Sequence, residues 1–239
     1  MLQNIAVSSL HLDPTNPRKA DQARLGLLRL SLAKLGFLMP VYATSSGMLL
    51  SGHQRLTVAK GMGIEHVPVV TVDIAEKDIK GINILFNRAT NDFNAFDTGS
   101  KAKERLGLED VIAAAEGLPD FDGEDWYAMQ CKERPILRYG KHEAERYDKK
   151  AVTLADSVMR MGIRIPIVVS KAGRVVNGVN RLFAAKEAGE KTWPIVIIPD
   201  SIASVALNFL NYLSMDFHVD DDFAKMMRYS AYRRPQNNR

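Results

Sequence analysis

The chain has 239 residues, of which 46% are hydrophobic and 25% are charged, a composition typical of a folded globular protein. This length allows one large domain or two modest ones. The one cysteine excludes an internal disulfide, and no apolar run approaches the length of about 18 residues that a membrane-spanning helix needs. The first residues also lack the basic segment and apolar run of a secretion signal, so we expect a cytoplasmic protein without a membrane partner.

The first predicted element is a helix over residues 23–35, because leucines recur in it at helical spacing and Gly36 follows as a C-terminal cap. A strand is expected after Pro40, and Gly47 is expected to turn the chain into a second strand. Gly52 then separates this strand from a second helix, and a last strand ends the unit. The predicted order is a helix, two strands, a helix and a strand, over residues 23–35, 41–43, 48–50, 53 to about 62, and 67–72. Such an order indicates an α+β unit with a glycine at a strand-to-helix junction.

The same order recurs 126 residues later. Residues 35–70 and 161–196 align without a gap and are identical at 11 of 36 positions, where unrelated sequences would share roughly two or three. The matching elements are predicted over residues 149–161, 167–169, 174–176, 179–188 and 193–198. Because only two copies exist, the sequence predicts a tandem duplication rather than a solenoid. The expected parts are a first copy (residues 1–105), a connecting segment of helix and loops (106–147), a second copy (148–223) and a tail (224–239).

The junction in the first copy reads Gly52-His53-Gln54-Arg55. A glycine there lets a ligand approach the backbone, and the first N–H groups of the helix form an anion site. Arg55 would add a partner for phosphate or carboxylate, and His53 could donate to a phosphate or act as a general acid or base. The pattern predicts a phosphate-binding corner, with a purely structural turn as the alternative.

The second copy keeps the glycine and the arginine, as Gly178 and Arg181, but has Val179 in place of the histidine and Asn180 in place of Gln54. Gly178, Asn180 and Arg181 could hold a second phosphate. Equally, the glycine could serve only the turn and the arginine could cap local carbonyls. Both interpretations stay open.

The succession of helix, Gly36, Pro40, strand, Gly47, strand, Gly52-x-x-Arg55 and helix resembles the ParB/sulfiredoxin superfamily. The resemblance covers residues 1–98 and, more loosely, 148–222, and Asn16-Pro17-Arg18 is similar to the segment that opens many ParB N-terminal domains. It implies a small mixed-sheet fold with flanking helices, in which the corner cradles nucleotide phosphates. A nucleoside triphosphate with Mg²⁺ is therefore the expected ligand. The superfamily includes CTP-hydrolysing partition clamps, sulfiredoxins, free-serine kinases and phage or plasmid proteins described as nucleases.

The chain departs from each of these relatives. Partition clamps usually carry Gly-Glu-Arg-Arg at the corner and a helix-turn-helix after it, and residues 106–145 show no such pattern, so we do not expect sequence-specific centromere binding. Sulfiredoxins use a corner cysteine, whereas Cys131 lies outside both repeats. A kinase needs a carboxylate to deprotonate the acceptor hydroxyl, and Asp13 is the nearest candidate by position.

A matching pattern of Asn, Asp, Phe and Asp follows each core, beginning at Asn87 and at Asn211. In the superfamily, a helix with such residues folds back over the nucleotide. The resemblance therefore implies that Asn87, Arg88 and Asp92 contact the base, the ribose or a Mg²⁺-bound phosphate, with His53, Asp13 and Asp92 as candidate catalytic groups. A helix cap formed by the Asn or Asp is the alternative.

The formal net charge of +4 permits contact with nucleic acid. Residues 224–239 contain five basic residues and no acidic one, with two tyrosines among them. Because cations attract the phosphate backbone and bases stack on aromatic rings, this tail is predicted to bind DNA through Lys225, Arg228, Tyr229, Arg233 and Arg234. The alternative is an amphipathic terminal helix that packs on the core.

Three functions remain open from the sequence. The first is a DNA-associated, nucleotide-binding pseudo-dimer of ParB-like domains, with or without hydrolysis. The second is an enzyme that acts on DNA itself, either a metal-dependent nuclease or a kinase of a hydroxylated base. The third is a non-enzymatic module that grips DNA or a protein. A homodimer is compatible with all three.

Overall fold

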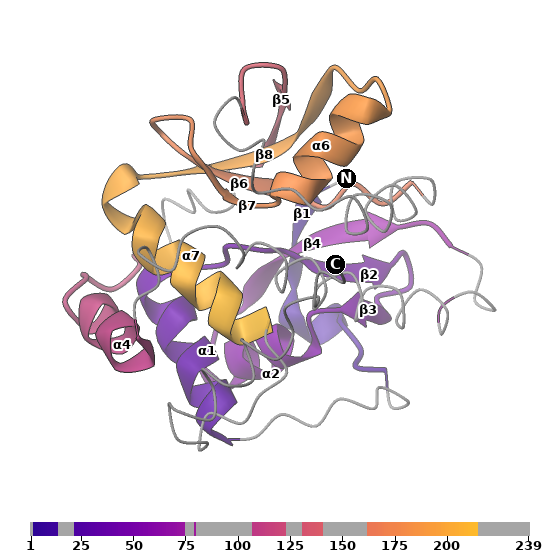
Figure 1. The fold of residues 1–239 in the computed structure, drawn as a ribbon. Coiled ribbons are helices and arrows are strands. Elements are labelled where there is room, and N and C mark those ends of the chain that lie inside the picture. The colour runs from indigo at the N-terminus through magenta and orange to yellow at the C-terminus, as the bar shows by residue number, and fades with distance from the viewer. Residues whose placement is uncertain are drawn as a thin grey trace, which may run out of the picture.

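The computed structural model describes residues 2–13, 22–74, 79, 107–122, 131–140 and 162–214. These residues form two four-stranded mixed sheets with helices packed around them (Figure 1). The α+β class predicted from the sequence is therefore confirmed. The helices that the structure describes include none with the length and apolar composition of a membrane span.

The first sheet has the strand order β1-β4-β2-β3. β2 and β3 are antiparallel, β2 and β4 are parallel, and β1 is antiparallel to β4. α2 connects β3 to β4. The elements in chain order are β1 (Leu2–Ala6), the short 3₁₀ helix η1 (Val7–Ser9), α1 (Gln22–Leu35), β2 (Val41–Thr44), β3 (Leu49–Ser51), α2 (His53–Gly61) and β4 (His66–Val72). Each of these except β1 and η1 lies within two residues of its predicted bounds.

The second sheet has the order β5-β8-β6-β7, so each strand takes the place of its counterpart in the first sheet. The register also corresponds, because Val41 faces Val69 in the first sheet and Ile167 faces Ile195 in the second. The elements are β5 (Lys132–Pro135), β6 (Ile167–Ser170), β7 (Val175–Asn177), α6 (Val179–Glu187), β8 (Thr192–Ile198) and α7 (Asp200–Ser214).

The predicted connecting segment contributes more than helix and loops. It contains α4 (Leu108–Glu116), as expected, and also β5, which is the edge strand of the second sheet. The residues of β5 are Lys132, Glu133, Arg134 and Pro135, which carry no alternating apolar pattern, so the sequence did not predict a strand. The predicted helix over residues 149–161 lies outside the described residues.

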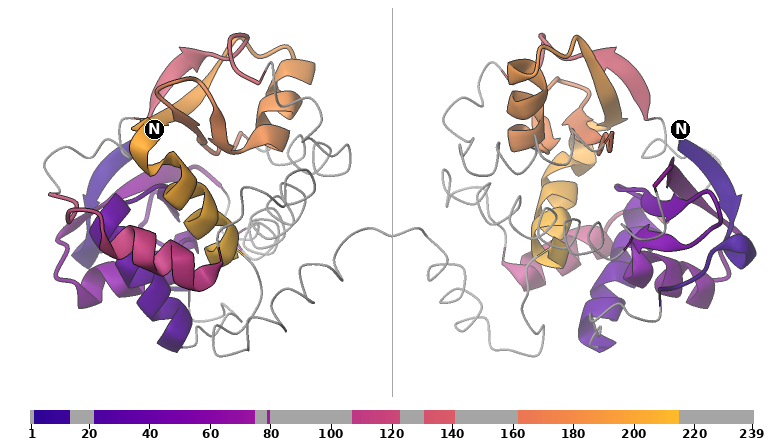
Figure 2. Two further views of the ribbon diagram at one scale, coloured as in Figure 1. Left: turned by 60° about the vertical axis from the view of Figure 1, so that its left-hand side comes forward. Right: turned by 90° about the vertical axis from the view of Figure 1, so that its right-hand side faces the viewer.

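Each sheet has a core of its own, and a third apolar cluster joins the two units. In the first unit α2 packs on β2 through Leu56 and Ala59, and in the second α6 packs on β6 through Leu182 and Ala185. The third cluster combines residues of α1, α4 and α7 with one face of the second sheet. Figures 1 and 2 show α7 leaving the second sheet and running across α1 with α4 beside it. The last described helix therefore fastens the second unit to the first.

Candidate functional site

The predicted corner begins at Gly52, between β3 and α2. Gly52 has a φ of +94°, and a Cβ built on it would lie 2.3 Å from Cγ1 of Val41. Only glycine meets both conditions without strain. The turn therefore brings the start of α2 directly against β2.

The first turn of α2 offers unused N–H groups. The backbone N–H of Leu56 donates to the Gly52 carbonyl at 2.9 Å, which closes the first helical hydrogen bond. The amides of His53, Gln54 and Arg55 precede that bond, and in the described part of the chain none of them has an acceptor. All three residues are half-buried rather than enclosed. Such amides, together with the helix dipole, favour an anion.

Arg55 adds a positive charge to the same corner. Its Nη1 donates to the carbonyls of Met39 at 2.6 Å and Pro40 at 2.5 Å, just before β2. Burial lowers the pKa of the Arg55 guanidinium to about 10, while nearby Tyr42 acts in the opposite direction. No carboxylate of the described residues pairs with this guanidinium. Among the described residues, the partners of this cation are thus backbone carbonyls, whose dipoles leave its net charge in place, and this favours an incoming anion.

Asp13 and His53 lie together, 40 residues apart in sequence. The contact is made by the backbone N–H of Asp13, which donates to Nε2 of His53 at 3.3 Å. Burial lowers the pKa of His53, the Asp13 charge raises it by a smaller amount, and the Arg55 charge lowers it. The structure therefore brings three predicted site residues into one place, and the hydrogen bond between Asp13 and His53 comes from the Asp13 amide.

The second corner has the same backbone but a different side-chain arrangement. Gly178 has a φ of +99°, and a Cβ on it would lie 2.8 Å from Nη2 of Arg181, so the guanidinium covers the glycine. That Nη2 donates to Oδ1 of Asn177. Asn180 and Arg181 are 2% and 6% exposed. This corner is closed by its own arginine, whereas in the first corner Gly52, His53, Gln54 and Arg55 are all half-buried.

A tryptophan explains part of this difference. The indole Nε1 of Trp193 donates to the Ile165 carbonyl at 2.9 Å. Ile165 corresponds to Met39 in the 126-residue repeat, and Trp193 corresponds to Val67. The counterpart of one of the two carbonyls that accept Arg55 thus accepts the Trp193 indole in the second unit. Arg181 instead bonds Asn177, where the first unit has Ser51.

The two corners also approach a common side chain. Tyr42 of β2 is 2% exposed, and burial raises the pKa of its phenol well above the usual range. The charges of Arg181 and Arg55 both act against that rise. Both guanidiniums therefore lie within electrostatic reach of one buried phenol.

The remaining predicted site residues lie outside the described residues. They are Asn87, Arg88 and Asp92 of the post-core segment, and Lys225, Arg228, Tyr229, Arg233 and Arg234 of the tail. Within the described ranges, no three His, Cys, Asp or Glu side chains gather as metal ligands would. Cys131 is half-buried, and burial with the nearby Glu133 charge raises the pKa of its thiol to about 12.

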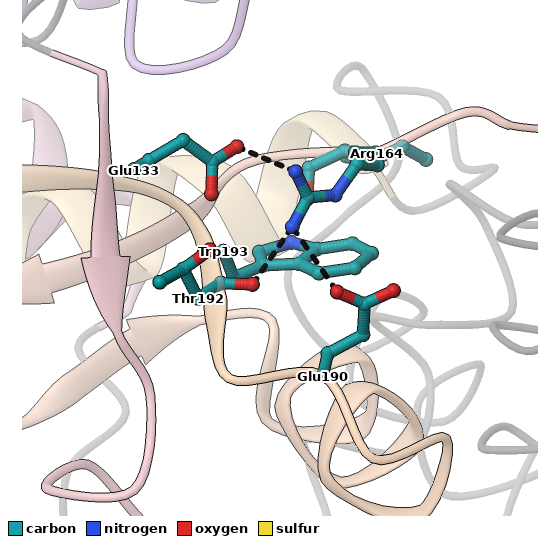
Figure 3. A network of polar contacts seen from close by, with 6 residues as sticks. Glu133, Arg164, Glu190, Thr192 and Trp193 are labelled. Atoms are coloured by element: carbon teal, nitrogen blue, oxygen red, sulfur yellow. Dashed lines mark hydrogen bonds and ion pairs between the residues drawn. The ribbon is translucent and has the colours of Figure 1, made fainter.

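The second sheet also carries a polar network that the sequence pattern did not predict. Arg164 lies over the Trp193 ring, 4.6 Å from its centre, and bonds Glu133 at 2.7 Å and the Thr192 carbonyl at 2.7 Å (Figure 3). Glu190 lies at 3.5 Å on the other side. Because Glu133 belongs to β5 and Thr192 to β8, this arginine ties the edge strand to its neighbour. Its alignment with Leu38 in the first copy gave no sign of that role.

No protein-family model matches the sequence, and no curated protein matches it. Among solved structures, the chain is similar to a Pnob8-like ParB-N domain, with 21% identity and a TM-score of 0.33 over 40% of this chain and 42% of that one. The chain thus spans less than half the length of that protein.

The chain is also similar to C-terminally truncated ParB, a chromosome-partitioning protein of Caulobacter crescentus. The form complexed with CTP-γ-S shows 15% identity, a TM-score of 0.36 and coverage of 67% and 89% of the two chains. The form complexed with the centromeric parS site shows 18% identity, a TM-score of 0.30 and coverage of 67% and 93%. Identities below 25% and TM-scores below 0.5 assign neither a family nor a function to this chain.

Proposed function

We propose that the chain is a ParB-like nucleotide-binding protein that holds the phosphates of a nucleoside triphosphate at the start of α2. The observation that carries this proposal is the pairing of three unused N–H groups with the Arg55 guanidinium, which has no carboxylate partner in the described residues. Both features favour negative charge, and Gly52 removes the side chain that would stand between them and β2.

Each residue of this corner has a separate role toward the phosphates. The amides of α2 and the Arg55 guanidinium supply positive potential, and His53 adds a ring nitrogen beside them. Mg²⁺ would accompany the triphosphate, with Asn87, Arg88 and Asp92 as the groups proposed for the base, the ribose or the metal-bound phosphate. The corner at Gly178 takes no phosphate in this proposal, because Arg181 already covers it.

The two units are proposed to be copies of one ancestral domain, the second of which serves as a scaffold. The common strand order and register support this proposal, as do the left-handed glycines that begin α2 and α6. DNA is proposed as the macromolecular partner on account of the basic and aromatic residues of the tail. Removal of residues 224–239 would then weaken DNA binding and flatten its salt dependence.

The direct test is calorimetric titration of the full chain with each of the four ribonucleoside triphosphates and Mg²⁺. Wild type is expected to bind at least one of them, and Arg55→Ala is expected to weaken that binding about tenfold or more, since charge-assisted hydrogen bonds are lost. If wild type binds no better than Arg55→Ala, the corner is not a nucleotide site. Labelled phosphate release in the same samples reports whether the nucleotide is hydrolysed.

A further inference from the structure

The contact between Asp13 and His53 defines the chemical state of the histidine. The segment before Asp13 is fixed beside β3, because the His11 amide donates to the Gly47 carbonyl at 2.9 Å and the Leu49 amide donates to the His11 carbonyl at 2.9 Å. Leu10 anchors the same segment, with 2% of its surface exposed. The Asp13 amide is therefore held in place by backbone hydrogen bonds and by a buried side chain.

A backbone amide can only donate, so Nε2 of His53 must accept and carries no proton. A neutral imidazole has one N–H, which then lies on Nδ1. Protonation of Nε2 would set two donors against each other across 3.3 Å. The local geometry thus selects one tautomer and opposes the imidazolium.

The surroundings of the ring act in the same direction. Burial and the Arg55 charge lower the pKa of His53, and the Asp13 charge offsets only part of this. Nδ1 itself makes no hydrogen bond to any residue in the described ranges. A neutral N–H group is therefore available at the first residue of α2.

We infer that His53 serves the corner as a neutral hydrogen-bond donor, which presents Nδ1–H to a phosphate oxygen while Asp13 holds Nε2. This inference rests on the proposed nucleotide site. In this role the neutral His53 orients one phosphate oxygen. The positive potential of the corner comes from Arg55 and the amides of α2. Nε2 is then not the atom of a general base. Val179, at the same place in the second copy, has no such donor.

The tautomer can be measured without any ligand. Side-chain ¹⁵N NMR of the five histidines, with His53→Asn to assign the signal, is expected to show His53 protonated on Nδ1 and neutral at pH 7. A proton on Nε2, or an imidazolium at that pH, would overturn the inference whether or not a nucleotide binds.

Binding of tripolyphosphate then tests the role of the donor. An asparagine amide can replace Nδ1–H and a glutamine amide reaches the position of Nε2, so His53→Asn is expected to bind within about threefold of wild type and His53→Gln to bind about fivefold more weakly. The ratio of the two affinities, wild type to His53→Asn, is expected to stay constant from pH 5.5 to 8, because titration of the polyphosphate is common to both proteins.

A ratio that rises as the pH falls would mean that the imidazolium is the binding form, and the reverse order of the two variants would mean that Nε2 is the donor. Either result overturns the inference. If wild type binds neither tripolyphosphate nor any nucleotide while NMR shows the expected tautomer, the proposed function fails and the state of His53 stands. Thermal unfolding of each variant confirms that it is folded before binding is compared.

Discussion

Arg55 and Arg181 occupy equivalent positions, three residues after a left-handed glycine, yet their guanidiniums donate in different directions. Arg55 bonds the carbonyls of Met39 and Pro40 before β2, whereas Arg181 bonds Oδ1 of Asn177 at the end of β7. Arg181 covers Gly178, whereas Arg55 does not cover Gly52. The difference arises from the neighbours of each arginine and not from the shared motif.

This relationship predicts that two matched substitutions differ in their effect on nucleotide affinity. Arg181→Ala is expected to lower the free energy of unfolding by about 2 kcal/mol, since a buried polar group loses its partner. Nucleotide affinity is expected to remain within about twofold of wild type. Arg55→Ala also removes hydrogen bonds, to the carbonyls of Met39 and Pro40, so it is expected to lower the free energy of unfolding too, but with a large loss of nucleotide affinity. Urea denaturation and calorimetric titration of both variants measure the two effects. Equal losses of affinity would contradict the assignment of the site to the first corner.

The glycine at the first corner predicts a steep cost for any side chain. Gly52→Ala is expected to destabilise the protein by about 2–4 kcal/mol, because a Cβ meets Val41 and the residue must keep a positive φ. Gly63→Ala is the control, since Gly63 has a φ of +73° with nothing within 4 Å of a Cβ. There only the backbone strain applies, at about 1 kcal/mol. Denaturation midpoints that fall equally in the two variants would mean that the contact with Val41 can relax.

His53 predicts a loss of stability in mild acid. Well above pH 6.5 the imidazole is neutral in both the folded and the unfolded chain, so it contributes nothing to the pH dependence. As the pH falls below that value, the unfolded chain takes up the proton first, because the pKa of His53 is lowered in the folded state. The free energy of unfolding should therefore drop between pH 7.5 and 5.5, and by less in His53→Asn. Chemical denaturation at the two pH values measures the difference, and identical drops would exclude a role for this histidine.

The Arg164 network predicts the behaviour of one edge strand. Arg164 is 35% exposed and its two carboxylate partners are 49% and 43% exposed, so the ion pairs are worth little, and Arg164→Ala should cost only about 1 kcal/mol, mostly from the lost contact with Trp193. The effect on β5 itself should be larger than this change in global stability. Amide hydrogen exchange of β5 is expected to accelerate relative to that of β8. Arg138→Ala is the matched control, because Arg138 also stacks on an aromatic ring, that of Tyr139, but does not join two strands. The same acceleration in the control would remove the special role of Arg164.

The sequence was sufficient for the elements that carry apolar periodicity and glycine stops. α1, β2, α2 and β4 were predicted for that reason, and the 126-residue repeat gave their counterparts β6, α6 and β8. β1 and β5 were missed, because an edge strand with a single neighbour needs no apolar alternation. The glycine and arginine of the corner were found from the motif. The motif did not predict the direction of each guanidinium, because that direction depends on Trp193 and Asn177. The hydrogen bond between Asp13 and His53 comes from a backbone amide. Every residue except proline has such an amide, so the residue types did not predict this contact.

The position of α7 has a consequence for the order in which the chain can fold. This helix follows the second sheet in sequence, yet Phe209 and its neighbours share an apolar cluster with Leu35 and Val111. During synthesis α1 and α4 leave the ribosome long before residues 200–214 exist. Their shared face must stay exposed until residues 200–214 have been made, so α1 and α4 cannot reach their final packing before the second sheet and α7 are synthesised.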